Sequence, residues 1–127
     1  MRVARTVARV AIALLFLFTG VMGFLMAPTP QPGMMGVVLD VLHRTHWSWF
    51  VSLAQIAIGL LLLTNRYVPV ALIMLFAFLY NSIAFHAGTS PQFLSLPIVV
   101  AGLGVFVGWP YRALFAQLFQ AKPAVSD

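Results

Sequence analysis

The sequence predicts an all-α integral membrane protein, a four-helix bundle with a short interfacial helix in the first outer loop. Three observations predict this fold class. Of the 127 residues, 62% are hydrophobic and 7% are charged, whereas soluble domains average about 25% charged residues. The apolar residues gather in four long segments. A chain this short has too little interior to hide so much apolar surface from water.

Each of the four apolar segments is expected to be a membrane-spanning helix. A spanning helix needs about 20 mostly apolar residues, and in hydrocarbon its backbone N–H and C=O groups must be paired within the segment. The first segment is longer than the apolar core of a secretory signal, about 7–15 residues, so we expect a retained helix there. The expected helices cover residues 7–27, 47–64, 68–86 and 93–109 of a single membrane domain, 1–127.

The link between the first two segments is predicted to lie on the outer side of the membrane. It opens with Pro28, Pro30, Pro32 and Gly33, a composition typical of an extended turn. The stretch Met34–Leu42 that follows is apolar but too short to span. We therefore expect it to be a short helix lying in the outer interface.

The basic residues predict the orientation. Membrane proteins keep Lys and Arg on the cytoplasmic side of their short loops. With a cytoplasmic N-terminus, Arg44 is the one basic residue on the outer side, and both termini are cytoplasmic. The cations lie at the ends of apolar segments and form no stripe, so we expect membrane lipids, and not nucleic acid, as their partners. The inner cations are Arg2, Arg5, Arg9, Arg66, Arg112 and Lys122.

Polar side chains at membrane depth form the candidate ligand site: Gln55, Asn81, Ser82 and His86. Each is costly in hydrocarbon and needs an explanation. One interpretation is hydrogen bonding between helices. The other is a pocket in which an amide and an imidazole bind the carbonyl oxygens of a quinone, with His86 exchanging protons near neutral pH. No catalytic residue is predicted, and the cofactor is left open beyond a quinone.

A metal site is a weaker interpretation of the histidines. Asp40, His43 and His46 follow one another at three-residue spacing, and His86 is expected on the same side of the membrane. These are ligand types for zinc or iron, but their spacing alone is not specific. We therefore expect no metal. The chain has no cysteine, which excludes disulfides and thiolate metal sites.

Gly104 and Gly108 form a GxxxG pair in the last apolar segment. Small residues at this spacing let two helix backbones approach closely. Two interpretations stand equally here: packing inside the bundle, or contact with a partner. Such a partner would be another membrane subunit or a second copy of the chain.

Two stretches of the sequence, Gly59–Leu72 and Tyr80–His86, carry a family resemblance. Their most specific parts are the Arg-aromatic-Val-Pro link at residues 66–69 and the Asn-x-x-x-Phe-His ending at residues 81–86. In these parts the chain resembles the DoxX and DoxX-like proteins, which are small four-helix bacterial membrane proteins. The resemblance implies the bacterial cytoplasmic (inner) membrane and an association with redox systems, since the best-known members are membrane subunits of thiosulfate:quinone oxidoreductase.

The chain departs from the family at one position that bears on function. Many relatives have a glutamate where this sequence has Gln55, which has a similar shape but cannot ionise. The resemblance therefore implies a small subunit of a redox, quinone-linked membrane complex that is not itself a stand-alone enzyme. The alternative is a purely structural helix bundle that packs within a larger membrane assembly.

Overall fold

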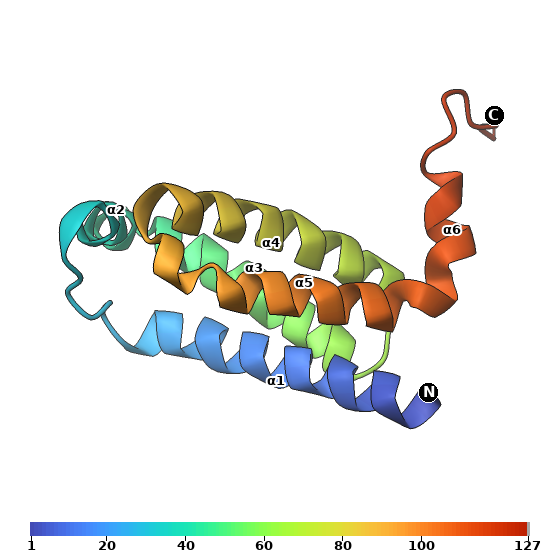
Figure 1. Ribbon diagram of the computed structural model, residues 1–127, viewed down its shortest axis with the longest axis horizontal. Coiled ribbons are helices and arrows are strands. Elements are labelled where there is room, and N and C mark those ends of the chain that lie inside the picture. The colour runs from blue at the N-terminus through green and yellow to red at the C-terminus, as the bar shows by residue number, and fades with distance from the viewer. Residues whose placement is uncertain (127) are drawn as a thin grey trace.

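Four long helices lie side by side in the computed structural model, which describes residues 1–126 (Figure 1). These residues contain no strand. Asp127, the last residue of the predicted domain, lies outside the described residues. The long helices are α1 (Arg2–Leu25), α3 (Trp47–Leu63), α4 (Val68–Thr89) and α5 (Ser95–Gly108). The shorter elements are α2 (Gly33–Arg44), η1 (Pro91–Phe93), η2 (Trp109–Tyr111) and α6 (Arg112–Gln117).

The long helices enclose a shared apolar core. Helix α1 contacts α3 and α5, and α4 contacts the same two helices from the other side. Helix α2 lies across one end, while the N-terminus, the α3–α4 link and α6 lie at the opposite end (Figure 1). Close packing of these apolar side chains holds the helices together. The core residues are Ala8, Ile12, Ala13, Phe16, Ile58, Leu62, Val68, Ala71, Leu72, Leu75, Leu79, Val100 and Val107.

The helix ends differ from the predicted ones for local reasons. The first helix begins at Arg2 rather than at residue 7, because arginine is a good helix former and the prediction counted apolar residues only. It ends at Leu25, since Ala27 precedes Pro28 and a residue before proline disfavours the helical conformation. Helix α4 runs on to Thr89 and stops before Ser90 for the same reason, because Pro91 follows.

The expected short helix in the first link is present as α2. The axes of α2 and α3 differ by 87° across a break of a few residues. His46 makes this sharp turn with a left-handed backbone conformation, φ 60°, which is uncommon for a residue other than glycine. Because of the turn, α2 covers the ends of the other helices instead of extending α3 (Figure 1).

Several helices are long and apolar enough to cross a membrane. Three qualify on their own, namely α1, α4 and the continuous stretch Pro91–Gln117, and the bent pair α2–α3 would make a fourth. Large apolar side chains are exposed along them, including Phe18 on α1, Phe50 on α3 and Ile98 on α5. The helices are therefore apolar on their outer surfaces as well as in the core, which is typical of membrane spans.

Helices α1 and α3 make the closest helix contact in the molecule. A Cβ atom added to Gly59 would lie 2.6 Å from Cγ of Leu17 and 3.0 Å from the carbonyl oxygen of Ala13. A Cβ added to Gly20 would lie 2.8 Å from Cγ1 of Ile56. Only glycine fits at these two positions while the backbones keep their present separation.

The glycine pair of α5 packs inside the molecule, against α4. A Cβ added to Gly104 would lie 3.2 Å from Cδ2 of Leu75, and one added to Gly108 would lie 3.2 Å from Cδ1 of Leu72. Both glycines are buried. Of the two interpretations of this pair, the structure places it within the bundle of helices and not on an outer surface.

Candidate functional site

A cavity of about 580 Å³ lies at the end of the molecule that α2 covers. Its wall is mainly apolar and includes Phe16 of α1, Leu39 of α2, Phe78 of α4 and Val100 of α5. Of the predicted ligand-site residues, Gln55, Ser82 and His86 line it. Thr19, Gln31 and Ser95 add further polar groups.

Gln55 is held in place by a hydroxyl group on the neighbouring helix. Its Nε2 atom donates a hydrogen bond of 3.0 Å to Oγ1 of Thr19. The Thr19 hydroxyl in turn donates to the backbone carbonyl of Leu15, at 3.0 Å. Because the single hydroxyl hydrogen of Thr19 is used on that carbonyl, its oxygen must accept from Gln55. The amide nitrogen of Gln55 therefore faces α1, and its carbonyl oxygen has no hydrogen-bond partner within residues 1–126.

His86 is fixed at the last turn of α4. Its Nδ1 lies 3.0 Å from Oγ of Ser90, which is buried, and the ring packs edge-on against Phe93 with 6.2 Å between centroids. The Ser90 hydroxyl also lies 3.3 Å from Oγ1 of Thr89. These contacts occupy Nδ1, and Nε2 makes no hydrogen bond within the described residues, so it is the ring nitrogen left for a ligand.

The structure does not bring Asn81 into this cavity. Its amide nitrogen donates to the carbonyl oxygen of Ala77 on the same helix, at 2.9 Å, and the side chain is exposed. Asn81 lines a separate hollow of about 790 Å³ between α2, α3 and α4, whose wall includes Trp47 and Met74. Ser82 borders both spaces. The predicted four-residue site is thus divided between two spaces.

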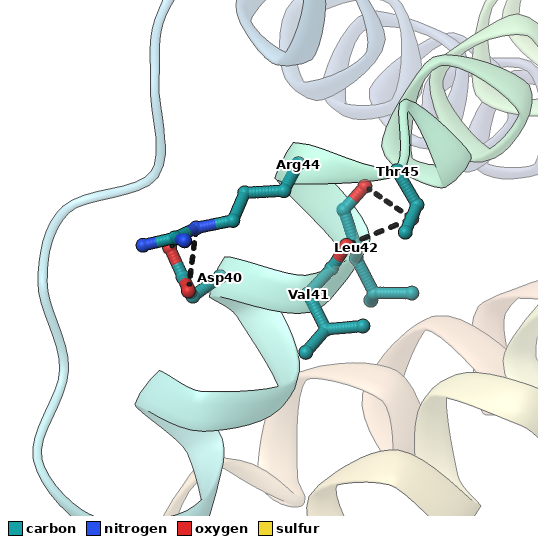
Figure 2. Close-up of polar contacts among 5 residues, drawn as sticks. All are labelled: Asp40, Val41, Leu42, Arg44 and Thr45. Carbon is teal, nitrogen blue, oxygen red and sulfur yellow. Dashed lines mark hydrogen bonds and ion pairs between the residues drawn. The ribbon is translucent and has the colours of Figure 1, made fainter.

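The weak metal candidates are not gathered into a site. Asp40 forms an exposed ion pair with Arg44, with 2.9 Å between the carboxylate oxygen and Nε, as Figure 2 shows. His46 packs its ring edge-on against Trp49, with 4.6 Å between centroids. Within residues 1–126 no three His, Cys, Asp or Glu side chains come close enough to hold a metal ion. His43 and His86 accordingly share no ligand set.

Figure 2 also shows why α2 ends where it does. The hydroxyl of Thr45 donates to the carbonyl oxygen of Val41, at 2.7 Å, and lies 3.4 Å from that of Leu42. The carbonyl of Val41 also accepts from the backbone N–H of Thr45, at 3.0 Å, so Leu42 is the one of the two whose carbonyl gains its partner from the hydroxyl. Together with the left-handed His46 that follows, these bonds fix the point at which α2 turns into α3.

Thr19 and Ser90, which position the side chains of the site, were not predicted from the sequence, and neither were the cavity-wall residues Gln31 and Ser95. Thr19 lies in the middle of an apolar segment, where a hydroxyl group needs a partner, and this signal could have found it. Ser90 lies just beyond the predicted end of the third helix, so its spacing of four residues from His86 was not considered. Both fix a predicted side chain by a hydrogen bond.

The arrangement can present either hydrogen-bond donors or acceptors to a ligand. Gln55 retains one amide N–H and its carbonyl oxygen. Nε2 of His86 is an acceptor when Nδ1 donates to Ser90, and a donor when Ser90 donates to Nδ1. The cavity therefore suits a mainly apolar molecule with polar groups that exchange between the two roles.

Fold and cavity together define an all-helical protein whose apolar helices could span a membrane and enclose a ligand-sized space at one end. Comparisons with known proteins found no matching family model, no similar curated protein and no similar solved structure.

Proposed function

We propose that this chain is a multi-pass membrane protein that binds a quinone in the cavity beneath α2. One observation carries the proposal: Gln55 and His86 line a single apolar cavity, and each keeps hydrogen-bonding atoms for a ligand. The cavity volume of about 580 Å³ falls within the range of about 300–1,000 Å³ that small-molecule sites occupy.

The membrane location is supported by the outer surfaces of the helices. Phe50 is 71% exposed, Phe18 is 64% exposed and Leu14 is 54% exposed. Each 100 Å² of such surface costs on the order of 2.5 kcal/mol in water. In a bilayer that cost disappears. The distribution of basic residues then favours both termini in the cytoplasm and α2 at the outer interface.

The choice of a quinone follows from the chemistry of the cavity wall. The oxidised ring presents carbonyl acceptors, and the reduced ring presents hydroxyl donors. The free N–H of Gln55 and a protonated Nε2 of His86 suit the oxidised form, while the Gln55 carbonyl and an unprotonated Nε2 suit the reduced form. The apolar wall suits the rest of the molecule.

The scarcity of titratable side chains in the cavity wall supports a non-catalytic role in a redox complex. Among the described residues that line the cavity, His86 is the one with a titratable side chain. In the resemblance to DoxX-like proteins Gln55 takes the position of a glutamate, and an amide cannot carry a proton. We propose that the chain is a DoxX-like subunit of the bacterial cytoplasmic membrane that binds quinone as the partner of an enzyme holding the redox centres.

The test is quinone affinity in mild detergent, measured by titration calorimetry with a short-chain quinone. Gln55→Leu and His86→Phe should each weaken binding roughly tenfold, because each leaves a polar atom of the ligand without its partner. Asn81→Leu is the matched control, since it also replaces an amide with leucine but lies outside the cavity. Its affinity should equal that of the unchanged protein.

Two outcomes would overturn the proposal. One is a purified, helical protein that binds no quinone at millimolar concentration. The other is an Asn81→Leu variant that loses as much affinity as Gln55→Leu, because binding would then not depend on this cavity.

A purely structural role in a larger assembly is less well supported. The glycine pair, for which contact with a partner was one of two equal interpretations, packs against α4. Exposed apolar surface is the remaining support for this role, and lipid covers such surface equally well. Co-purification of a stoichiometric membrane partner together with an absence of quinone binding would favour the structural role.

A further inference from the structure

Five arginines gather at the end of the molecule opposite α2. Three belong to the start of α1, one follows α3 and one begins α6, and Figure 1 shows these segments at the same end. Within residues 1–126 the one acidic side chain is Asp40, which lies on α2 and is paired with Arg44. The described residues therefore supply no carboxylate side chain to this end. The arginines are Arg2, Arg5, Arg9, Arg66 and Arg112.

Arg9 and Arg112 have partners within the chain. The guanidinium of Arg9 donates to the carbonyl oxygens of Leu62 and Leu63, at the C-terminal end of α3. That end carries a partial negative charge, so the contact is favourable. Arg112 donates to the carbonyl oxygen of Trp109, at 2.9 Å, and its guanidinium carbon lies 5.2 Å from the centroid of the Trp109 ring.

Arg5 differs, because one of its donors is buried without a partner. Its guanidinium carbon lies 5.4 Å from the centroid of the Phe106 ring on α5. Its Nε atom is buried and has no hydrogen-bond partner within the described residues. A buried charged donor left unsatisfied is costly, and such atoms are rare in native proteins. An acceptor outside the chain cannot reach this buried atom, but it can bind the terminal nitrogens of the same guanidinium, which are not buried and make no hydrogen bond within the described residues.

Arg5 and Arg112 contact two aromatic rings, Phe106 and Trp109, on one side of the helical stretch formed by α5 and η2. Phe106 and Trp109 are three residues apart, so they lie about one turn from each other on the same face. Each ring holds a guanidinium group from a different part of the chain, one from α1 and one from the start of α6. Guanidinium groups match phosphate oxygens in geometry and charge.

We infer that this edge between α1 and α5 binds the phosphate of an anionic phospholipid, with Arg5 as the main donor and Arg112 beside it. Exposed apolar side chains continue along α5 from Phe106, including Val105 beside it and Val99 two turns away on the same face. They suit the acyl chains of the same lipid. The inference rests on the proposed membrane location but not on the cavity ligand.

The test compares phosphatidylglycerol with phosphatidylcholine on the delipidated full-length protein, by native mass spectrometry. The unchanged protein should retain phosphatidylglycerol, and Arg5→Gln should lower that retention at least about tenfold. Arg44→Gln is the matched control, because it removes the same charge from an exposed side chain at the other end. It should retain phosphatidylglycerol as the unchanged protein does.

A second measurement covers the case in which Arg5→Gln does not fold. Phosphatidylglycerol should raise the Tm of the unchanged protein by several degrees more than phosphatidylcholine does. Equal retention or equal stabilisation by the two lipids would overturn the inference. So would equal losses in Arg5→Gln and Arg44→Gln, or displacement of phosphatidylglycerol by 100 mM inorganic phosphate, which would indicate a free-anion site.

The lipid result can be separated from the cavity result. Folded Arg5→Gln should keep the quinone affinity of the unchanged protein, because Arg5 does not line the cavity and belongs to the start of α1, whose N-terminal end lies opposite α2. Loss of lipid retention with intact quinone binding supports the lipid site. Intact lipid retention in a protein that binds no quinone would overturn only the cavity proposal.

Discussion

Gln55 on α3 and Thr19 on α1 are joined by a hydrogen bond of 3.0 Å, and Thr19 also donates to the backbone of its own helix. This bond fixes which way the Gln55 amide points. It also links the closest-packed pair of helices to the wall of the cavity. In the proposed site Thr19 is thus a positioning residue, since it would act on a ligand through Gln55.

Removing the Thr19 hydroxyl should weaken ligand binding even though this hydroxyl acts on the ligand only through Gln55. Thr19→Val keeps the side-chain shape but removes the acceptor, so the Gln55 amide loses its anchor. We expect roughly a fivefold lower quinone affinity, corresponding to about 1 kcal/mol. Thr19→Ser keeps the hydroxyl and should restore most of the affinity in the same titration. Equal losses in the two variants would show that packing, and not the hydroxyl, is what matters.

Adding a methyl group at Gly59 should destabilise the protein. Gly59→Ala places a Cβ 2.6 Å from Leu17, and overpacking of this kind costs about 1–3 kcal/mol. Gly102→Ala is the control, because nothing lies within 4 Å of the added atom. That change should be neutral or stabilise by up to about 1 kcal/mol. Thermal unfolding in detergent measures both, and a Gly59→Ala variant as stable as Gly102→Ala would contradict the close contact.

Removing the guanidinium of Arg9 should lower the free energy of unfolding. Its bonds to Leu62 and Leu63 satisfy carbonyl groups at the end of α3, and contacts of this type contribute about 1 kcal/mol. Arg9→Gln should therefore unfold at a lower temperature than Arg2→Gln, whose side chain is exposed. Identical melting curves for the two variants would argue against the contact.

The ion pair between Asp40 and Arg44 should contribute little stability. Both side chains are more than half exposed, at 55% and 77%, and surface pairs contribute about 0–1 kcal/mol. Asp40→Asn should change the free energy of unfolding by less than about 1 kcal/mol, with the loss shrinking further at high salt. A much larger loss in chemical unfolding would reveal a role for Asp40 that the pair in Figure 2 does not explain.

The proposed orientation can be tested by labelling single cysteines, since the chain has none of its own. Thr29→Cys precedes α2 and should react in intact cells with a thiol reagent that does not cross membranes. Ala121→Cys follows α6 and should react only after the membrane is opened. The reverse pattern would invert the topology, and labelling of both positions in intact cells would contradict it.

The composition was enough to predict helices of about the right length and number. The 87° turn between α2 and α3 was not predictable, because it depends on a left-handed conformation at His46 that this residue rarely adopts. The first helix was predicted too short, since Arg2 and Arg5 were read as flanking cations rather than as helix formers. Pro28 and Pro91 are local signals in the sequence, and α1 and α4 each end shortly before one of them.

The site was predicted only in part. The spacing of residues along a helix shows which of them share a face, but it does not show which neighbouring helix or cavity that face meets. Gln55 and His86 do meet in one cavity, although they come from different helices. Asn81 lies on an adjacent face of α4 and bonds to its own backbone, so it faces another space. Distinguishing these faces requires knowing how α4 is rotated, and its nearly uniform apolar sequence gives no such signal.

The glycine contact between α1 and α3 has a consequence for assembly during translation. Both helices are complete once residue 63 has been synthesised, so this pair can form before α4 and α5 leave the ribosome. We expect the later helices to add to this existing pair, so that the contacts of Gly104 and Gly108 form last. A fault at Gly59 would therefore disturb every subsequent step, whereas one at Gly104 would leave the first pair intact.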